Sequence, residues 1–461
     1  MTMKDKAKSP AGSSIAGRVP TGQLILFALP SFMIALMHGP MYGVLPGIYG
    51  KYFGVDLAVV GTVVLVSKLF DAVTDPVIGF LSDRTRTPIG ARKPWLIAGA
   101  AVTLPGLYFL FSPPQSVTTA YYLGWSLVMY LGWTMSEIPY GAWTTELSRD
   151  YSERTRISLY RAVVALFGSL AMALAPLLPI FDGTEMTPEV LRWLAVVVVI
   201  ALPITTAIAV LFAPVGDPRL SDTADRWSAI FASVRRNRPF QIFTIVYLIQ
   251  GLGWGMTSSL SFIYFDTYLG IGDKISALMA PAILISLVAL LTWGKIIKKI
   301  GKTPAWAFSM AGTGGFILAM AWIDPGPDSF LPYLLASCAM VFAIGGATIA
   351  PLAIIGDIVD YDILKTGVNR AGSYMALFTL AVKVNLALGS AVGFYLIDLF
   401  GYDPQGVEHG STAILGLQLS YIYLPALLLA SSSLIIWRFP LDQRRHGIVR
   451  RRLEAPAARE T

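Results

Sequence analysis

The chain has 461 residues, of which 55% are hydrophobic and 14% are charged, a composition far more apolar than that of soluble domains. This excludes an ordinary soluble protein, because such a fold would have too little polar surface to face water. The formal net charge of +7 does not indicate a nucleic-acid partner, because the basic residues follow the membrane topology described below. Cys338 is the only cysteine, which excludes a disulfide framework and a cysteine-based metal site.

Apolar segments of membrane length recur along the whole chain. A helix needs about 20 apolar residues to cross the hydrocarbon of a bilayer. We therefore predict an all-α membrane protein with twelve transmembrane helices in two six-helix bundles. The predicted spans are residues 22–50, 55–81, 94–113, 117–146, 157–181, 191–213, 239–269, 274–297, 304–323, 329–358, 370–400 and 412–438.

The lysines and arginines collect in alternate loops between these spans, as they do in cytoplasmic segments under the positive-inside rule. The only lysines and arginines on the other side are Lys51, Arg192 and Lys274. The polar tail 1–21 is followed by an apolar segment too long for a signal peptide, so we expect a retained first span. We therefore predict a multi-pass protein of the plasma membrane, typically a bacterial inner membrane, with both termini in the cytoplasm.

Residues 214–238 form the longest internal hydrophilic segment and divide the spans six and six. We interpret this segment as a cytoplasmic linker between two bundles, 22–213 and 239–438, with a basic cytoplasmic tail at 439–461. Two bundles that rock about a site at the midplane are typical of secondary transporters. Twelve helices alone would also fit a polytopic enzyme or a channel.

Three charged residues lie inside the second predicted span, in VSKLFDAVTDPVIGF. Charges inside the hydrocarbon are costly and usually functional. Asp71 and Asp75 are four residues apart, on one face of a helix, and Lys68 lies one turn earlier. Two converging carboxylates favour a bound Na⁺ or H⁺, so we predict a cation-coupling site. A charge pair that snorkels to the interface or is neutralised by Lys68 is the structural alternative.

Glu137 is the acidic residue of the fourth span, in GWTMSEIPYGAW. Pro139 leaves backbone carbonyl groups free for a ligand, a hydroxyl group or water, and Thr134 lies one turn before Glu137. Trp133 offers a face on which an apolar group or a sugar ring can stack. We predict solute binding at Glu137 and Trp133, although packing explains a tryptophan in a span equally well.

Lys383 lies deep in the eleventh span, with about ten apolar residues on either side. It cannot easily reach the interface, so it must pair with an acid of the second or fourth span. We predict that Lys383, Arg161 in the fifth span and His38 in the first span contact the solute. Instead of contacting the solute, Lys383 could form a structural salt bridge between the bundles. His38 could instead form a hydrogen bond to a neighbouring helix.

An acidic run, GDIVDYD, marks the cytoplasmic end of the tenth span and includes Asp362. We predict that this run faces the basic loops of the first half and forms salt bridges that close an inner gate, since surface ion pairs are weak enough to break. The predicted gating residues are Asp83, Arg84, Arg92, Lys93, Asp357 and Asp360.

The sequence contains no nucleotide-phosphate loop, zinc-ligand spacing or nucleophile elbow. The energy for transport would therefore come from an ion gradient. We expect neither an enzyme nor a cofactor beyond the coupling ion. The expected partners are a small sugar-like solute and membrane lipid, and we expect a functional monomer.

The stretch SKLFDAVTDPVIGFLSDRTRTPIGARKPWLIAGA strongly resembles the second helix, cytoplasmic loop and third helix of the glycoside–pentoside–hexuronide:cation symporters. This is the melibiose permease family of the major facilitator superfamily. The segments SEIPYGAW, DIVDYDILKTGVNRAGSY and LAVKV resemble that family's fourth helix, tenth-helix end and eleventh helix. The matches cover both halves of the chain in the family's order, so the resemblance implies the major facilitator fold.

The resemblance also implies a cation site. On the matching positions, Asp71 and Asp75 would bind the coupling cation and would be the metal ligands if that cation is Na⁺. Thr134 would be a further oxygen ligand, and Lys383 would lie nearby.

A solute pocket is implied in the same way. Glu137 matches a family aspartate that contacts the sugar, and Arg161 matches an arginine of the same pocket. Glutamate adds one methylene, which moves the carboxylate by about 1.5 Å. The melibiose permease has a first-helix aspartate that binds sugar hydroxyl groups, whereas the first span here offers only His38. A sugar, a glycoside, a related small solute and a lysolipid all remain open.

The predicted spans contain three basic and three acidic residues of interest, so these charges balance. The basic residues are Lys68, Arg161 and Lys383, and the acidic residues are Asp71, Asp75 and Glu137. A bound coupling cation would leave an excess positive charge, which an anionic solute such as a uronide or a sulfonated sugar would balance. An exporter or antiporter of the same fold, and a membrane-embedded enzyme or receptor, remain the alternatives to a symporter.

Overall fold

The computed structural model describes residues 18–148, 150–216, 237–368, 370–406, 409–441, 445–449 and 451–452. The described residues form helices and loops, with no β-strand among them. The tail 1–17, most of the predicted linker and the last nine residues lie outside the described residues, so the predicted domain boundaries there stay predictions.

The first half of the chain forms one helical bundle. Its first predicted span is two α-helices, α1 and α2, joined by a π-helical turn. The elements are α1 (Thr21–Gly39), η1 (Pro40–Val44), α2 (Leu45–Phe53), α3 (Leu57–Arg84), α4 (Lys93–Phe111), α5 (Thr119–Glu146), α6 (Tyr151–Leu174), η2 (Ala175–Leu177) and α7 (Pro188–Phe212).

The second half forms the other bundle. Its first and last spans also contain π-helical turns, η4 and η8. The elements are α9 (Arg238–Phe262), η4 (Ile263–Tyr268), η5 (Gly272–Lys274), α10 (Ile275–Ile300), α11 (Lys302–Ala319), η6 (Met320–Trp322), η7 (Pro327–Ser329), α12 (Phe330–Thr366), α13 (Ala371–Leu399), α14 (Ser411–Gln418), η8 (Leu419–Tyr423) and α15 (Leu424–Trp437).

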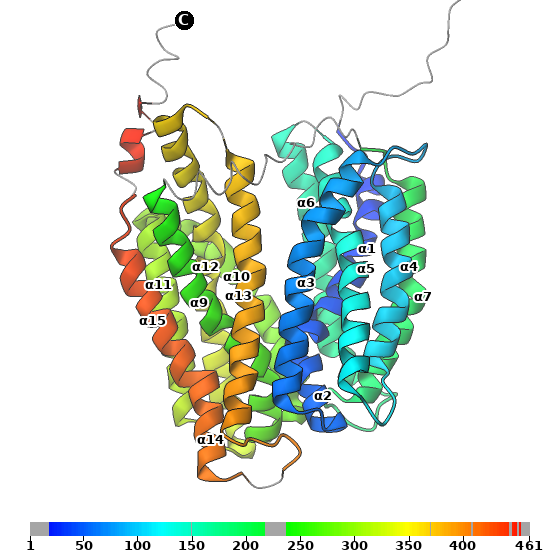
Figure 1. The fold of residues 1–461 in the computed structure, drawn as a ribbon, viewed down its shortest axis with the longest axis vertical. Helices are drawn as coiled ribbons and strands as arrows, with labels where there is room; N and C mark the ends of the chain where they lie inside the picture. The colour runs from blue at the N-terminus through cyan, green and yellow to red at the C-terminus, as the bar shows by residue number, and fades with distance from the viewer. Residues whose placement is uncertain are drawn as a thin grey trace, which may run out of the picture.

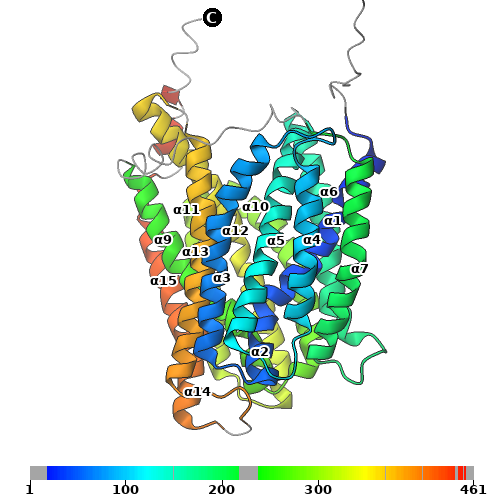
Figure 2. The same cartoon turned by 45° about the vertical axis from the view of Figure 1, so that its right-hand side comes forward.

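The two bundles stand side by side with their helices roughly parallel to one long axis (Figure 1). Turning the molecule brings α3 and α13 forward as neighbours at the junction of the bundles (Figure 2). Each predicted span corresponds to a helical segment of the described chain. Ten described helices are long and apolar enough to cross a membrane. The helices α5 and α9 fall outside that set, because Gly, Ser, Thr, Trp and Tyr lower their apolar character, but both pack within their bundles.

Several helices extend beyond the predicted spans. Helix α6 begins at Tyr151, before the predicted residue 157, and α12 continues to Thr366, past the predicted residue 358. The sequence rule detects only the apolar part of a helix, whereas polar turns can continue into water with their backbone hydrogen bonds intact. Gly367, with a φ of 69°, ends α12 in a left-handed conformation that glycine adopts readily.

Polar caps fix several helix starts. The Asp56 side chain accepts hydrogen bonds from the backbone N–H groups of Ala58 and Val59, at 2.9 and 3.2 Å. Thr118 caps α5 in the same way, through a 3.2 Å bond from Tyr121. Such caps satisfy N–H groups that lack partners within the helix, so α3 and α5 begin where a short polar side chain is available.

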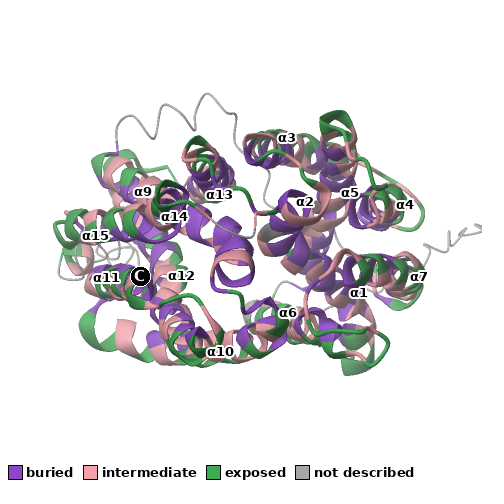
Figure 3. Cartoon of the chain, turned by 90° about the horizontal axis from the view of Figure 1, so that it is seen from below, coloured by how far each residue is buried: buried purple, intermediate pink, exposed green. Residues whose placement is uncertain are grey.

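The loops between helices lie on two faces of the molecule. We call the face with the loops 85–92 and 147–150 the basic face, and the face with the α2–α3 and α13–α14 loops the opposite face. The basic face is the one predicted to be cytoplasmic. Seen along the helices, the buried residues of both bundles turn toward the molecule's interior (Figure 3).

Small residues allow α4 and α5 to pack closely. A Cβ atom on Gly132 would lie 2.4 Å from the backbone nitrogen of Thr103, and one on Gly106 would lie 2.7 Å from that of Met129. Membrane helices lack a strong hydrophobic drive to associate, so close contact between backbones contributes much of their attraction. These glycines therefore set the separation of α4 and α5.

We predict that Gly132→Ala destabilises the first bundle. Alanine favours a helix by about 0.5–1 kcal/mol over glycine, but the clash with Thr103 should cost about 1–3 kcal/mol, so the melting temperature of detergent-solubilised protein should fall. Gly124→Ala in the same helix is the control, because a Cβ atom there meets nothing within 4 Å. Equal melting temperatures of the two variants would contradict this account of the packing.

Candidate functional site

A cavity of about 590 Å³ lies between the two bundles, a volume typical of small-molecule sites. It runs along α6 toward the basic face, since Ser158 near the start of α6 and Thr379 near the start of α13 both line it. Its charged and aromatic lining comes from α1, α3, α5, α6 and α13. These residues are His38, Asp71, Asp75, Trp133, Glu137, Arg161 and Lys383.

The centre of the site is an ion-pair cluster that joins the bundles. The Nζ atom of Lys383 lies 2.6 Å from Oδ2 of Asp71 and also forms an ion pair with Asp75. The ion pair with an acid that the depth of Lys383 predicts is therefore present. Thr134, which is fully buried, donates a 2.6 Å hydrogen bond to Oδ1 of Asp71. One lysine from α13 thus pairs with two carboxylates of α3 and offsets one of their two negative charges.

Helix geometry explains why both carboxylates meet the same ammonium group. Residues four apart on α3 lie on one face, and α3 packs along α13. Asp71 is buried, whereas 13% of the Asp75 side chain is exposed. Oδ1 of Asp75 is a buried oxygen with no hydrogen-bond donor among the described residues. Asp75 therefore has acceptor capacity beyond its ion pair.

Lys68 does not line the cavity, although it lies one turn from Asp71. Its side chain is buried, and its Nζ atom lies 5.8 Å from the centre of the Tyr130 ring. Lys68 therefore points toward the interior of the first bundle.

A second polar group lies beside the cluster. Nη2 of Arg161 is 3.5 Å from Oε1 of Glu137, and its guanidinium carbon lies 3.8 Å from the centre of the Tyr140 ring. Thr144 accepts a 2.8 Å hydrogen bond from Nη1 of Arg161, and Ser31 accepts a 3.4 Å one from Nε. The Arg161 guanidinium is therefore held in a fixed orientation at the cavity wall.

The sequence-based predictions missed the residues that orient Arg161. Tyr140 and Thr144 follow Glu137 by three and seven residues, which places all three on one face of α5. That spacing was a usable signal. Ser31 gave no comparable signal, because its proximity to Tyr140, 3.1 Å between hydroxyl oxygens, depends on the packing of α1 against α5.

His38 and Trp133 form the aromatic part of the wall. Their ring centres lie 5.5 Å apart with the planes tilted by 35°. Trp133 lies one turn before Glu137 on α5, so an aromatic surface adjoins the polar group formed with Arg161. The cavity therefore combines charged groups with a flat apolar surface, as in many solute pockets.

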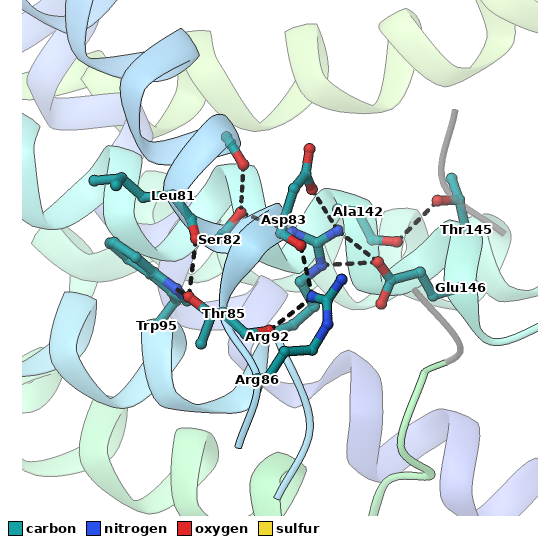
Figure 4. Close-up of polar contacts among 11 residues, drawn as sticks. Leu81, Ser82, Asp83, Thr85, Arg86, Arg92, Trp95, Ala142, Thr145 and Glu146 are labelled. Carbon is teal, nitrogen blue, oxygen red and sulfur yellow. Dashed lines mark hydrogen bonds and ion pairs between the residues drawn. The ribbon is translucent and has the colours of Figure 1, made fainter. Parts of the chain in front are cut away.

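On the basic face, Arg92 is the centre of a buried network within the first bundle (Figure 4). Nη2 of Arg92 lies 2.6 Å from Oε1 of Glu146 and 2.6 Å from Oδ1 of Asp83. Nη1 donates a 2.7 Å hydrogen bond to Ser82. Burial alone lowers the pKa of Arg92, but the two carboxylates outweigh it and raise that pKa overall. Glu146 is a partner that the sequence analysis did not identify.

The remaining predicted gating residues of the first bundle also contact that bundle. Nζ of Lys93 donates hydrogen bonds to the backbone oxygens of Val210 and Ala213, at 2.6 and 2.9 Å. The Arg84 guanidinium lies over the Phe80 ring, 3.8 Å from its centre. In the described structure these basic side chains are therefore engaged inside the first half.

The predicted ion pairs between the acidic run and the basic loops are not formed among the described residues in this conformation, so the closing of an inner gate by these residues stays a prediction. Nζ of Lys302 lies 2.5 Å from Oδ1 of Asp357, and Nε2 of His446 in the C-terminal tail lies 2.9 Å from Oδ2 of Asp360, so both acids pair within the second half of the chain. Asp362 likewise pairs with Arg370 of its own bundle, at 3.2 Å. The reason is geometric, because the cavity extends toward the basic face between the bundles and the nearest opposite charges lie within each bundle.

The family described as MFS/sugar transport protein matches residues 26–443. The chain belongs to this family of transporters. The match confirms the resemblance to the glycoside–pentoside–hexuronide:cation symporters, and a transporter family is not a class of enzymes.

Curated relatives of the MFS/sugar transport protein family align along almost the whole chain. The uncharacterized symporter YnaJ of Bacillus subtilis (strain 168) is 27% identical and covers 93% of each chain. The isoprimeverose transporter of Lactiplantibacillus pentosus is 23% identical, over 95% of this chain and 92% of its own. The glucuronide carrier protein homolog of Escherichia coli (strain K12) is 25% identical, over 86% of this chain and 87% of its own.

Solved structures agree with the fold. A point mutant of the nucleoside transporter NupG gives a TM-score of 0.69 at 15% identity, over 90% of this chain and all of that one. A bacterial homolog of the human lysosomal transporter Spinster gives a TM-score of 0.68 at 13% identity, over 91% of this chain and 97% of that one. These similarities support the major facilitator fold.

We predict that the two partners of Arg92 contribute unequally to stability. Glu146 has 1% of its side chain exposed and Asp83 has 49%. Glu146→Gln leaves a buried guanidinium short of one charge partner, which should cost about 3–5 kcal/mol, whereas Asp83→Asn should cost at most about 1 kcal/mol. Thermal unfolding in detergent measures both. An Asp83→Asn variant at least as destabilised as Glu146→Gln would contradict the network described.

Proposed function

We propose that this protein is a cation-coupled symporter of a small sugar-like solute that works by alternating access. The supporting observation is the position of Lys383, which comes from the second bundle and pairs with both Asp71 and Asp75 of the first. The Glu137–Arg161 group lines the same cavity. A cation site and a solute site that share one wall at the junction of two bundles can be coupled by movement of those bundles.

We take the basic face to be the cytoplasmic one, because its loops carry most of the lysines and arginines. The conformation described is then open toward the cytoplasm. The location is the plasma membrane. The proposed cation and solute sites both lie within one chain, so transport as proposed requires no second copy.

Cation binding proceeds by exchange at the two carboxylates. The Lys383 ammonium pairs with both Asp71 and Asp75 in the described conformation. Na⁺ or H⁺ entering this site replaces the ammonium group, and Thr134 is close enough to Asp71 to supply a further oxygen. Carboxylate and hydroxyl oxygens are suitable ligands for a hard cation. Two carboxylates without either partner would repel each other, so one cation or the other occupies the site throughout.

Solute binding uses the Glu137–Arg161 group, which lies beside the cation site. Glu137 accepts hydrogen bonds from solute hydroxyl groups, Arg161 donates to solute oxygens, and Trp133 provides a stacking surface. Oε2 of Glu137 is a buried oxygen with no hydrogen-bond donor among the described residues, so a solute hydroxyl group can satisfy it once the side chain turns toward the cavity. The contacts from Ser31, Tyr140 and Thr144 orient Arg161 in advance, which reduces the ordering cost of binding.

The exchange at the cation site couples cation binding to solute binding. Once a cation has replaced it, the Lys383 ammonium carries an uncompensated positive charge into the same cavity as the solute. An anionic solute restores the balance, so cation binding raises solute affinity. By linkage, the solute raises cation affinity by the same factor.

We predict that Asp75→Cys abolishes gradient-driven accumulation while the protein still inserts into the membrane, because one of the two cation-binding carboxylates is lost. Solute uptake into proteoliposomes with an imposed Na⁺ or H⁺ gradient is the measurement. Asp324→Cys, an exposed acid on the opposite face, is the matched control. Unchanged accumulation by Asp75→Cys would refute the role of Asp75, and efflux opposed by the gradient would identify an exporter or antiporter instead.

We also predict a preference for anionic solutes. In paired uptake assays, a uronide or sulfonated sugar should be taken up in preference to its neutral counterpart. Arg161→Gln should reduce uptake of the anionic member by about 10- to 100-fold, as expected for a lost charge-assisted hydrogen bond. Arg156→Gln is the control, because Arg156 pairs with Glu153 outside the cavity. Transport of the neutral members alone would contradict the charge argument.

A further inference from the structure

On the opposite face, an ion pair joins the two bundles far from the central cavity. Nζ of Lys51, at the end of α2, lies 2.6 Å from Oδ2 of Asp266 in η4. The exposed fractions of the two side chains are 26% and 2%. A charge as buried as Asp266 needs a close partner, so this pair holds the bundles together only while that face is closed.

Both partners are fixed by their surroundings. A Cβ atom on Gly272 would lie 1.9 Å from Oδ1 of Asp266, so the loop backbone packs directly against that carboxylate. The side-chain amide of Gln405 donates a 3.1 Å hydrogen bond to the backbone oxygen of Lys51. The pair is therefore part of a formed interface.

A second carboxylate, Glu185 in the loop between η2 and α7, belongs to the same bundle as Lys51. The preceding residue, Thr184, donates a 2.6 Å hydrogen bond to the backbone oxygen of Asp273 in the second bundle. Asp273 follows Gly272, which packs against Asp266, so the Glu185 loop lies beside the ion pair, and the charge of Glu185 acts on both Lys51 and Asp266. The Thr184 bond ties the Glu185 loop to the second bundle while the face is closed.

We propose that Lys51 exchanges partners when the opposite face opens, leaving Asp266 of the second bundle and pairing with Glu185 of the first. The inference rests on the alternating access proposed above. Separation of the bundles breaks the Thr184 bond together with the Lys51–Asp266 pair, which frees the Glu185 loop at the moment when Lys51 loses its partner. Lys51 then has a carboxylate partner in both conformations, and the opening of this face is favoured by a contact that exists only in the open state.

The test measures distances between the bundles directly. Spin labels on cysteines placed at Ser116 and Asp324, both exposed on the opposite face, report the separation in a Cys338→Ser background. Asp266→Asn should increase the long-distance, open population. Adding Glu185→Gln to Asp266→Asn should lower that population by about two- to fivefold, the ratio expected for a partly exposed ion pair. Asp182→Asn, in the same loop and exposed, is the matched control and should change nothing.

A charge reversal separates this mechanism from a simple loss of contact. Lys51→Asp with Asp266→Lys restores a pair across the bundles but places a carboxylate at position 51, beside Glu185, so the open population should fall below that of the unmodified protein. Adding Glu185→Lys should restore it. The proposal is overturned if Asp266→Asn fails to increase the open population, if Glu185→Gln has the effect of Asp182→Asn, or if Glu185→Lys restores nothing. These readouts need no solute, so a failure of the proposed transport activity would be seen separately.

Discussion

The ion pairs between Lys383 and the two aspartates of α3 join the two bundles at the centre of the molecule. Ionised side chains are tolerated at this depth in a membrane only when partners neutralise them. Because Lys383 belongs to α13 and the acids to α3, that requirement also holds the two bundles in register along their closest junction. The same three residues form part of the charged lining of the cavity.

The two bundles are tightly built within themselves and more lightly joined to each other. Close packing at Gly132 and Gly106 fixes α4 against α5, and the buried Arg92 network fixes the basic end of the first bundle. The junction combines apolar contacts, such as Gly47 with Phe262 and Gly61 with Phe394, with ion pairs made by Lys383 at the centre and Lys51 on the opposite face. Rigid bundles joined in part by ion pairs are suited to movement as whole bodies.

Much of the fold followed from the sequence, because membrane length and charge asymmetry constrain each span locally. Asp71, Asp75, Glu137 and Lys383 were identifiable for the same reason, since a charge in an apolar span has few structural explanations. Their partners were less predictable. The predicted partners of Asp357 and Asp360 in the first bundle are not the ones observed in this conformation, because sequence gives the sign of a charge and its end of the helix but not its neighbours. The π-helical turns and the contacts of Ser31 and Glu146 depend likewise on packing between helices, which no local pattern contains.

In the proposed mechanism, the coupling cation and the Lys383 ammonium compete for Asp71 and Asp75. The most direct test is a cation titration of purified protein, followed by tryptophan fluorescence, for the unmodified chain and for Lys383→Gln. If the two compete, Lys383→Gln removes the competitor and Na⁺ or H⁺ binds at lower concentration. Unchanged or weaker cation binding by Lys383→Gln would contradict the account.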